Sequence, residues 1–431
     1  MRRFANGLAP LAAIVLLVVL SACGGGPGTK VTVSIESLDH APTLPLSVAY
    51  QVGDGEWSWL RPGEDASYGF AVPPGETRYG VAVRCPGMGA GLGQAGPGVK
   101  IDIYQLTLDD TAHPVFYCGW YKKPRIGLPT HVEVRGVTGA RSYRLLYEAA
   151  NRHRDETTDD TNIWVHPGTG RDVLLMAYSS GSWDPEPADL LAGRLFRNLD
   201  FQEGASLDLA LSNADALGVR NVRLTNLPGG WNASYAVGLI TRGGVARFHA
   251  TLGEGAGSGT YRTLANPGEG DFYTLDASAS NIPMGGPLLR ISAVRAVPAA
   301  TAGDLEAGLP EPYPQDYAPD TTGPAVAFDL PQAAGAAGYT LRLERHGSGP
   351  VVWVSAAWLN GRSRYTMPDL SELPGFEPVD PSPDPPKDWG ICTLVSELNL
   401  AEIAGDPGGE ALLPYELGKP FEIDSACAYA D

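Results

Sequence analysis

The chain has 431 residues with 49 acidic side chains against 31 Lys and Arg, so its formal net charge is −18 at pH 7. This acid excess repels a phosphate backbone, and it excludes nucleic acid from the expected partners. Hydrophobic residues make up 43% of the chain, too many for a disordered protein, and 54 glycines and 37 prolines indicate frequent turns between short strands. We therefore expect an all-β protein made of several tandem β-sandwich domains.

Residues 1–22 have the organisation of a secretory signal peptide. Arg2 and Arg3 precede an apolar run from Leu11 to Leu20. That run is too short for a membrane span, which needs about 20 residues, and it matches the apolar region of a signal peptide.

Leu20-Ser21-Ala22-Cys23 resembles the lipobox of bacterial lipoproteins, where the signal is cleaved before the cysteine and the thiol receives diacylglycerol. The resemblance implies that Cys23 is the lipidation site, that residues 23–29 form a lipidated flexible tether, and that the partner at this end is a membrane. No acidic residue follows Cys23, which favours the outer membrane or cell surface if the envelope is diderm. The alternative is an ordinary cleaved signal peptide with an unmodified Cys23.

The first predicted module covers residues 30–122. Val31, Val33 and Ile35 alternate with polar residues, as on a half-buried strand. Gly53-Asp54-Gly55 then supplies residues that suit a hairpin turn. Strands recur about every ten residues, as is typical of β-sandwiches, and the pattern resembles an immunoglobulin-like sandwich.

The second predicted module covers residues 125–216. Alternating Tyr143, Leu145 and Tyr147 predict a strand, and the apolar run Val173–Met176 predicts a buried one. The pattern resembles carboxypeptidase-regulatory or transthyretin-like sandwiches. Pro187 suits a first helical turn, so we expect one short helix within 189–195.

A third β-rich module is predicted at 219–297, and a C-terminal one at 324–431. Between them, residues 298–323 are rich in proline and acidic residues without periodicity, which predicts a linker that acts as a semi-stiff spacer. In the last module, we expect a strand over 351–359 turned back by Asn360-Gly361.

Five cysteines fit an exported protein. With Cys23 assigned to lipid, four remain, and four cysteines allow three pairings. We expect Cys85–Cys118 and Cys392–Cys427, because each of these bridges stays inside one module. A zinc site is the alternative, but there is no Cys-x-x-Cys and no histidine at ligand spacing from a cysteine.

Trp57 and Trp59 lie two residues apart on a predicted strand, so both side chains point to one face. Such a pair is either a glycan-binding platform or part of the sandwich core.

The densest acidic stretch holds Asp155, Glu156, Asp159 and Asp160. Its carboxylates are candidate calcium ligands, and the alternative is a solvated hairpin tip. Apart from this ion, no cofactor is expected.

The motifs of serine hydrolases, P-loop enzymes and zinc proteases are absent from the sequence. We therefore expect a non-enzymatic, lipid-anchored envelope protein with a structural, adhesive or display role. The alternative is a carbohydrate- or peptidoglycan-binding lipoprotein, and the third hypothesis is an extracellular hydrolase. Expected partners are the membrane, an envelope glycan or another surface protein.

The lipobox generates the first testable prediction. Cys23→Ser should leave an uncleaved precursor that incorporates no radiolabelled palmitate, because the acceptor thiol is gone. Pulse labelling in a bacterial host measures both effects. Unchanged palmitate incorporation would show that Cys23 is not the lipid site.

Overall fold

The structure is a computed structural model. It describes residues 28–37, 41–63, 67–86, 99–119, 123–148, 150–182, 189–242, 250–252, 257–265, 267–281, 286–322, 325–344, 349–377, 388–404 and 419–430. Strands in several sheets dominate it, which confirms the predicted all-β, multidomain sandwich fold. Four units follow one another along the chain: unit 1 (28–119), unit 2 (123–216), unit 3 (217–309) and unit 4 (325–430).

Unit 1 is a sandwich of two sheets. Its strands are β1 (Thr29–Glu36), β2 (Ser47–Val52), β3 (Ser58–Trp59), β4 (Tyr68–Val72), β5 (Arg78–Pro86), β6 (Val99–Thr107) and β7 (Val115–Tyr117). A three-stranded sheet has the order β4-β1-β7, and β1 is antiparallel to β4 but parallel to β7. The other strands follow the order β3-β2-β5-β6, and apolar side chains of both sheets share one core.

Unit 2 repeats this strand order. Its elements are β8 (Ile126–Gly136), β9 (Ser142–Tyr147), β10 (Ala150–Arg154), β11 (Thr158–Val165), β12 (Gly168–Tyr178), β13 (Leu190–Phe201), β14 (Leu207–Ser212) and the 3-10 turn η2 (Asn213–Asp215). The sheets are β11-β8-β14 and β10-β9-β12-β13. The helix expected within 189–195 is therefore wrong, since this segment lies in β13, where it pairs with β12.

Unit 3 has the same order again. Its strands are β15 (Gly218–Thr225), β16 (Asn232–Ile240), β17 (Ala250–Leu252), β18 (Ser258–Thr263), β19 (Phe272–Asn281), β20 (Leu288–Pro298) and β21 (Leu305–Gly308). The sheet β18-β15-β21 faces β17-β16-β19-β20 across a shared core.

Unit 4 contains β22 (Ala327–Asp329), β23 (Ala336–Glu344), β24 (Pro350–Ser355), α2 (Ala356–Leu359), β25 (Arg364–Thr366), β26 (Asp388–Ser396), α3 (Leu400–Ala404) and β27 (Phe421–Ala430). β22 pairs with β25, and the larger set has the order β24-β23-β26-β27. The strand expected over 351–359 ends at Ser355, because the Ser355 hydroxyl accepts a hydrogen bond from the Trp358 N–H and caps α2.

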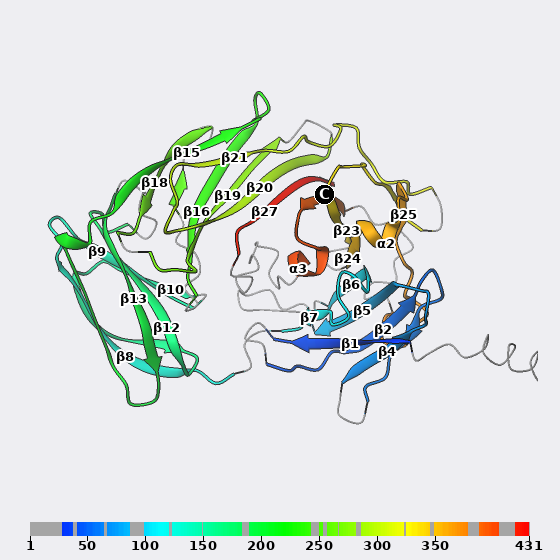
Figure 1. Cartoon of the computed structure of the whole chain (residues 1–431), viewed down its shortest axis with the longest axis horizontal. Coiled ribbons are helices and arrows are strands. Elements are labelled where there is room, and N and C mark those ends of the chain that lie inside the picture. The colour runs from blue at the N-terminus through cyan, green and yellow to red at the C-terminus, as the bar shows by residue number, and fades with distance from the viewer. Residues whose placement is uncertain are drawn as a thin grey trace, which may run out of the picture.

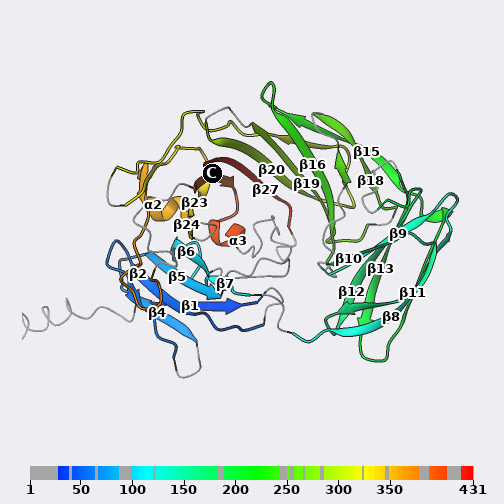
Figure 2. The same ribbon diagram turned by 180° about the vertical axis from the view of Figure 1, so that it is seen from behind.

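Three of the units share one sheet. β20 of unit 3 pairs antiparallel with β27 of unit 4, and β24 of unit 4 pairs parallel with β6 of unit 1. The result is a twelve-stranded sheet that runs through units 3, 4 and 1. The four units are arranged along an arc in the order 1, 4, 3 and 2, as Figure 1 shows and, from behind, Figure 2.

Within the predicted linker 298–323, the described residues 298–322 include a strand and contacts with the units, which corrects the expectation of a semi-stiff spacer. Leu305–Gly308 forms β21, paired parallel with β15. The Tyr313 hydroxyl lies 2.7 Å from the Thr393 hydroxyl, and the Tyr317 hydroxyl donates to the Asp329 carbonyl at 2.8 Å. These contacts hold the connector on unit 4, so units 3 and 4 are not joined by a flexible link.

Unit 2 docks on unit 3 through a strand that is buried on both faces. Val173, Leu175 and Ala177 of β12 face the core of unit 2, whereas Leu174 and Met176 belong to the core cluster of unit 3. Burial on both sides explains why this strand is continuously apolar rather than alternating.

A buried ion pair reinforces this joint. Arg197 of β13 donates from Nη1 to Asp271 Oδ1 at 3.2 Å, and the same Nη1 lies 3.7 Å from Asp172 Oδ2. The Asp271 side chain is 0% exposed, so its charge depends on Arg197 and on the Gly268 N–H that donates to it at 2.6 Å. Because this carboxylate is buried, removal of Arg197 would leave it without its counter-charge.

We predict that Arg197→Ala lowers the free energy of unfolding by about 3–5 kcal/mol, because it leaves a buried carboxylate without its counter-charge. Urea denaturation of the full chain measures this, with the exposed Arg223→Ala as the control. The double variant Arg197→Ala/Asp271→Asn should regain part of the loss. A loss no larger than that of Arg223→Ala would contradict the assigned role.

Candidate functional site

Both predicted disulfides are present. Cys85 of β5 bonds to Cys118, which follows β7, with a Cα–Cα distance of 5.2 Å, and this bridge joins the two sheets of unit 1. Cys392 of β26 lies directly opposite Cys427 of β27, with a Cα–Cα distance of 4.1 Å. The second bridge fixes the strand that carries the pairing between units 4 and 3.

Trp57 and Trp59 lie in different environments, one half-buried and the other exposed. Trp57 is half-buried against the core of unit 4, and its ring covers Gly80, where an added Cβ would lie 2.8 Å from Trp57 Cη2. Trp59 is 43% exposed, and the Arg61 guanidinium carbon lies 4.8 Å from the centre of its ring. The two rings therefore do not form one open platform.

The acidic stretch runs from the turn between β10 and β11, which lie in opposite sheets of unit 2, into β11, and its carboxylates point to different partners. Asp159 accepts a hydrogen bond from the Tyr143 hydroxyl at 2.7 Å, and Asp160 lies 2.6 Å from His131 Nδ1. Asp155 lies beside Gly181. No group of three or more His, Cys, Asp or Glu side chains suited to a metal ion is found within the described ranges. Calcium binding by Asp155, Glu156, Asp159 and Asp160 stays a prediction.

Cys23 and the signal segment lie outside the described residues. In the part of the chain that the structure covers, no helix is long and apolar enough to cross a membrane.

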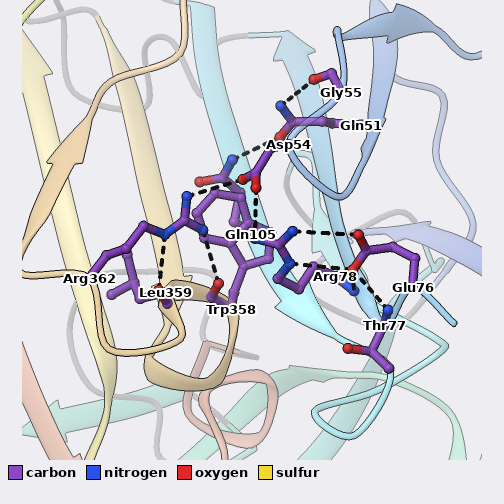
Figure 3. A network of polar contacts seen from close by, with 10 residues as sticks. All are labelled: Gln51, Asp54, Gly55, Glu76, Thr77, Arg78, Gln105, Trp358, Leu359 and Arg362. Carbon is purple, nitrogen blue, oxygen red and sulfur yellow. Dashed lines mark hydrogen bonds and ion pairs between the residues drawn. The ribbon is translucent and has the colours of Figure 1, made fainter.

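The most connected polar site lies between units 1 and 4 (Figure 3). It begins at Trp358, a buried residue of the one-turn helix α2. The Arg362 guanidinium carbon lies 4.5 Å from the centre of the indole ring, and that of Arg78 lies 5.9 Å away. Arg362 comes from unit 4 and Arg78 from β5 of unit 1, so one indole receives a cation from each unit.

Asp54 joins these two cations. Its Oδ1 lies 3.1 Å from Arg362 Nη1, and its Oδ2 lies 3.0 Å from Arg78 Nη1. Arg362 is held in place by donation from Nε to the Leu359 carbonyl at 2.9 Å. Asp54 sits in the β2–β3 turn that the glycine-rich sequence predicts, and Gly53 there has a φ of 57°.

A row of amides extends the site into the seam between β6 and unit 4. Gln105 of β6 donates from Nε2 to Gln51 Oε1 at 3.0 Å and accepts from the Tyr365 hydroxyl at 2.5 Å. Tyr365 is buried and belongs to unit 4. The site thus contains paired charges and paired amides, and its effect is to fix unit 4 against unit 1. Sequence patterns identified the turn at Asp54 but not its partners, Arg78 on β5 and Arg362, which lies 308 residues away.

The pKa values at this site follow its charges. Partial burial raises the pKa of Asp54, but the hydrogen bonds from Arg362 and Arg78 outweigh it, and the net pKa is lowered. The backbone N–H of Arg78 is the largest cause that lowers the pKa of Glu76. Both carboxylates are therefore ionised at neutral pH.

No protein-family model and no curated protein matches the chain. Among solved structures it is similar to the pilus adhesin SpaC from Lactobacillus rhamnosus GG, with 11% identity and a TM-score of 0.12 over 76% of this chain and 43% of that one. The chain spans less than half the length of that adhesin. A likeness at this TM-score carries no argument about function.

We predict that Asp54→Asn lowers the free energy of unfolding by about 0.5–1 kcal/mol at pH 7, a modest value because Asp54 is 57% exposed. A carboxyl whose pKa is lowered in the folded state contributes fully to the free energy of unfolding at a pH above its usual pKa of 3.8. That contribution is lost as the pH falls through the lowered pKa of the folded state.

The difference between wild type and Asp54→Asn should therefore shrink when urea unfolding is repeated below about pH 4. The exposed Asp316→Asn is the matched control. A difference that stays constant between pH 7 and pH 3 would contradict the assignment.

Proposed function

We propose that the mature protein is a lipid-anchored scaffold of a bacterial envelope that displays an adhesive surface and performs no catalysis. The observation that carries the proposal is the sheet shared by units 1, 3 and 4, together with the docking of unit 2 on unit 3. A chain joined in this way behaves as one stiff body rather than as domains on flexible links.

The position of the tether supports a display role. If Cys23 carries the lipid, the five residues that follow it, up to Gly28, reach at most about 18 Å, so the start of β1 lies close to the bilayer. In Figure 1, β1 starts at the right of unit 1, whereas unit 2 occupies the left of the molecule. Unit 2 would then be carried away from the membrane.

The acid excess also supports exposure to solvent outside the cytoplasm. A net charge of −18 favours solubility and disfavours adsorption to anionic surfaces, including the headgroups of the membrane that would hold the protein. Two or more acyl chains would supply the stable anchoring that the charge does not.

The test compares bacterial cells that carry the wild-type chain with cells that carry Cys23→Ser. We expect a membrane-impermeant label to reach wild-type protein on intact cells, and wild-type cells to adhere to native envelope or host matrix coatings. Cells with Cys23→Ser should adhere no better than cells without the gene, because the uncleaved, unlipidated precursor is not delivered to their surface.

Adhesion that is unchanged by Cys23→Ser would contradict the display role. A broad hydrolase screen tests the absence of catalysis, with the carboxylate-paired histidines as probes. Reproducible turnover that disappears in His131→Ala or His166→Ala would overturn the non-enzymatic assignment.

A further inference from the structure

Trp164 is an exposed aromatic side chain that sequence patterns did not single out. Five large apolar side chains are exposed within the described residues: Leu44, Leu46, Trp59, Trp164 and Val219. Trp164, at 60% exposure, belongs to unit 2. Its neighbours Ile163 and Val165 are buried in the core of unit 2, so Trp164 of β11 points outward.

The ring of Trp164 lies flat across the next strand. Gly127 of β8 pairs with Trp164, and a Cβ built on Gly127 would lie 3.8, 3.9 and 4.0 Å from Cη2, Cζ3 and Cζ2 of the indole. Since these three adjacent ring atoms are almost equally distant, that point lies over the face of the ring rather than beyond its edge. One face of the indole therefore covers Gly127, and the other is turned to solvent.

Polar side chains continue the same face of the sheet. Asn162 lies two residues before Trp164 on β11, about 7 Å along the strand, and Asp160 lies two residues further. Across the pair, Pro129 and His131 of β8 are opposite Asn162 and Asp160. Asp160 is 88% exposed and His131 Nδ1 contacts it at 2.6 Å.

This face is directed away from the rest of the molecule. Unit 2 meets unit 3 through the outer face of the other sheet, which contains β12. Figure 2 shows β11 at the outer edge of unit 2.

We propose that this face binds an uncharged pyranose glycan, with one sugar stacked on Trp164 and the chain extending toward Asn162 and the Asp160–His131 pair. Sugar rings present an apolar C–H face to an aromatic ring and hydroxyls at their rim. The Asn162 side-chain amide can both donate and accept hydrogen bonds. In the Asp160–His131 pair, the carboxylate accepts and the imidazole can donate, so both groups suit sugar hydroxyls. The inference rests on the proposed display role and names the class of ligand that the displayed surface would bind.

The surroundings favour a glycan over a protein partner. A protein interface gains most of its energy from a cluster of buried apolar and aromatic anchors, whereas Trp164 stands beside a glycine, a proline and polar groups. The acid excess of the chain, with Asp160, Asp208 and Glu133 on this sheet, disfavours anionic sugars. The glycan is therefore expected to be uncharged.

The test uses the full chain in detergent on an array of uncharged oligosaccharides, including chito-, cello-, xylo- and manno-tetraose. The same array carries heparin fragments and sialyllactose as anionic sugars for comparison. Isothermal titration then gives the affinity for each array hit. Trp164→Ala should weaken binding about tenfold or more, as expected for loss of one stacked aromatic contact. Gly127→Val should also weaken it, because a branched side chain lifts the ring off the sheet.

Trp59→Ala is the matched control, because Trp59 is likewise exposed but lies on unit 1 beside Arg61. It should leave the affinity unchanged, and thermal unfolding of all variants shows whether the fold is kept. Trp164→Tyr should restore part of the affinity lost in Trp164→Ala.

The proposal is overturned if no uncharged oligosaccharide binds the wild type, if only anionic arms bind, or if Trp164→Ala binds as well as the wild type. Capture of an apolar peptide that depends on Trp164, without any sugar binding, would also overturn it. Because this experiment needs no membrane, its outcome is separate from that of Cys23→Ser. A failure of display leaves glycan binding standing, and the reverse also holds.

Discussion

The edges of the four-stranded sheets impose the constraint on which the whole molecule depends. An open edge carries a row of unpaired N–H and C=O groups, which is both costly and prone to aggregation. Here the backbone groups at the edges of β20 and β27 pair with each other over nine residue pairs, and those of β24 pair with β6 over five. The units must therefore keep fixed positions relative to one another, because any rotation between them would break this backbone pairing. The ion pairs and the indole between units 1 and 4 add specificity to a joint that the backbone already makes.

The alternation of apolar and polar residues predicted most of the strands in this fold. Val31, Val33 and Ile35 lie on β1 with their side chains in the core, as their period of two requires. The cysteine pairings also followed from the sequence, since pairing within each module left one solution. The repeated strand order of the units was not visible, because it is a property of long-range pairing and leaves no repeated residue pattern.

Other expectations failed for identifiable reasons. Composition hid β21, because Leu305 and Ala307 alternate correctly but are surrounded by proline and acidic residues typical of linkers. The end of β24 was missed because Ser355 caps a single turn of helix, a local hydrogen bond that outweighs strand propensity. The spacing of Trp57 and Trp59 is visible in the sequence, whereas the ring of Trp164 lies over Gly127 on a neighbouring strand, 37 positions earlier, which no local pattern indicates.

The parallel pairing of β1 and β7 has a mechanical consequence. A chain held at Cys23 and pulled through unit 2 is loaded at the start of β1 and at the end of β7, which point the same way. Tension then acts along the strands, so the bonds from Thr32 N to the Ala112 carbonyl and from Cys118 N to the Glu36 carbonyl are sheared together instead of being unzipped one at a time. The bridge from Cys118 to Cys85 passes part of this load directly to β5 in the long sheet. Unit 1 is thus arranged to resist flow and traction at the point where the protein would leave its membrane.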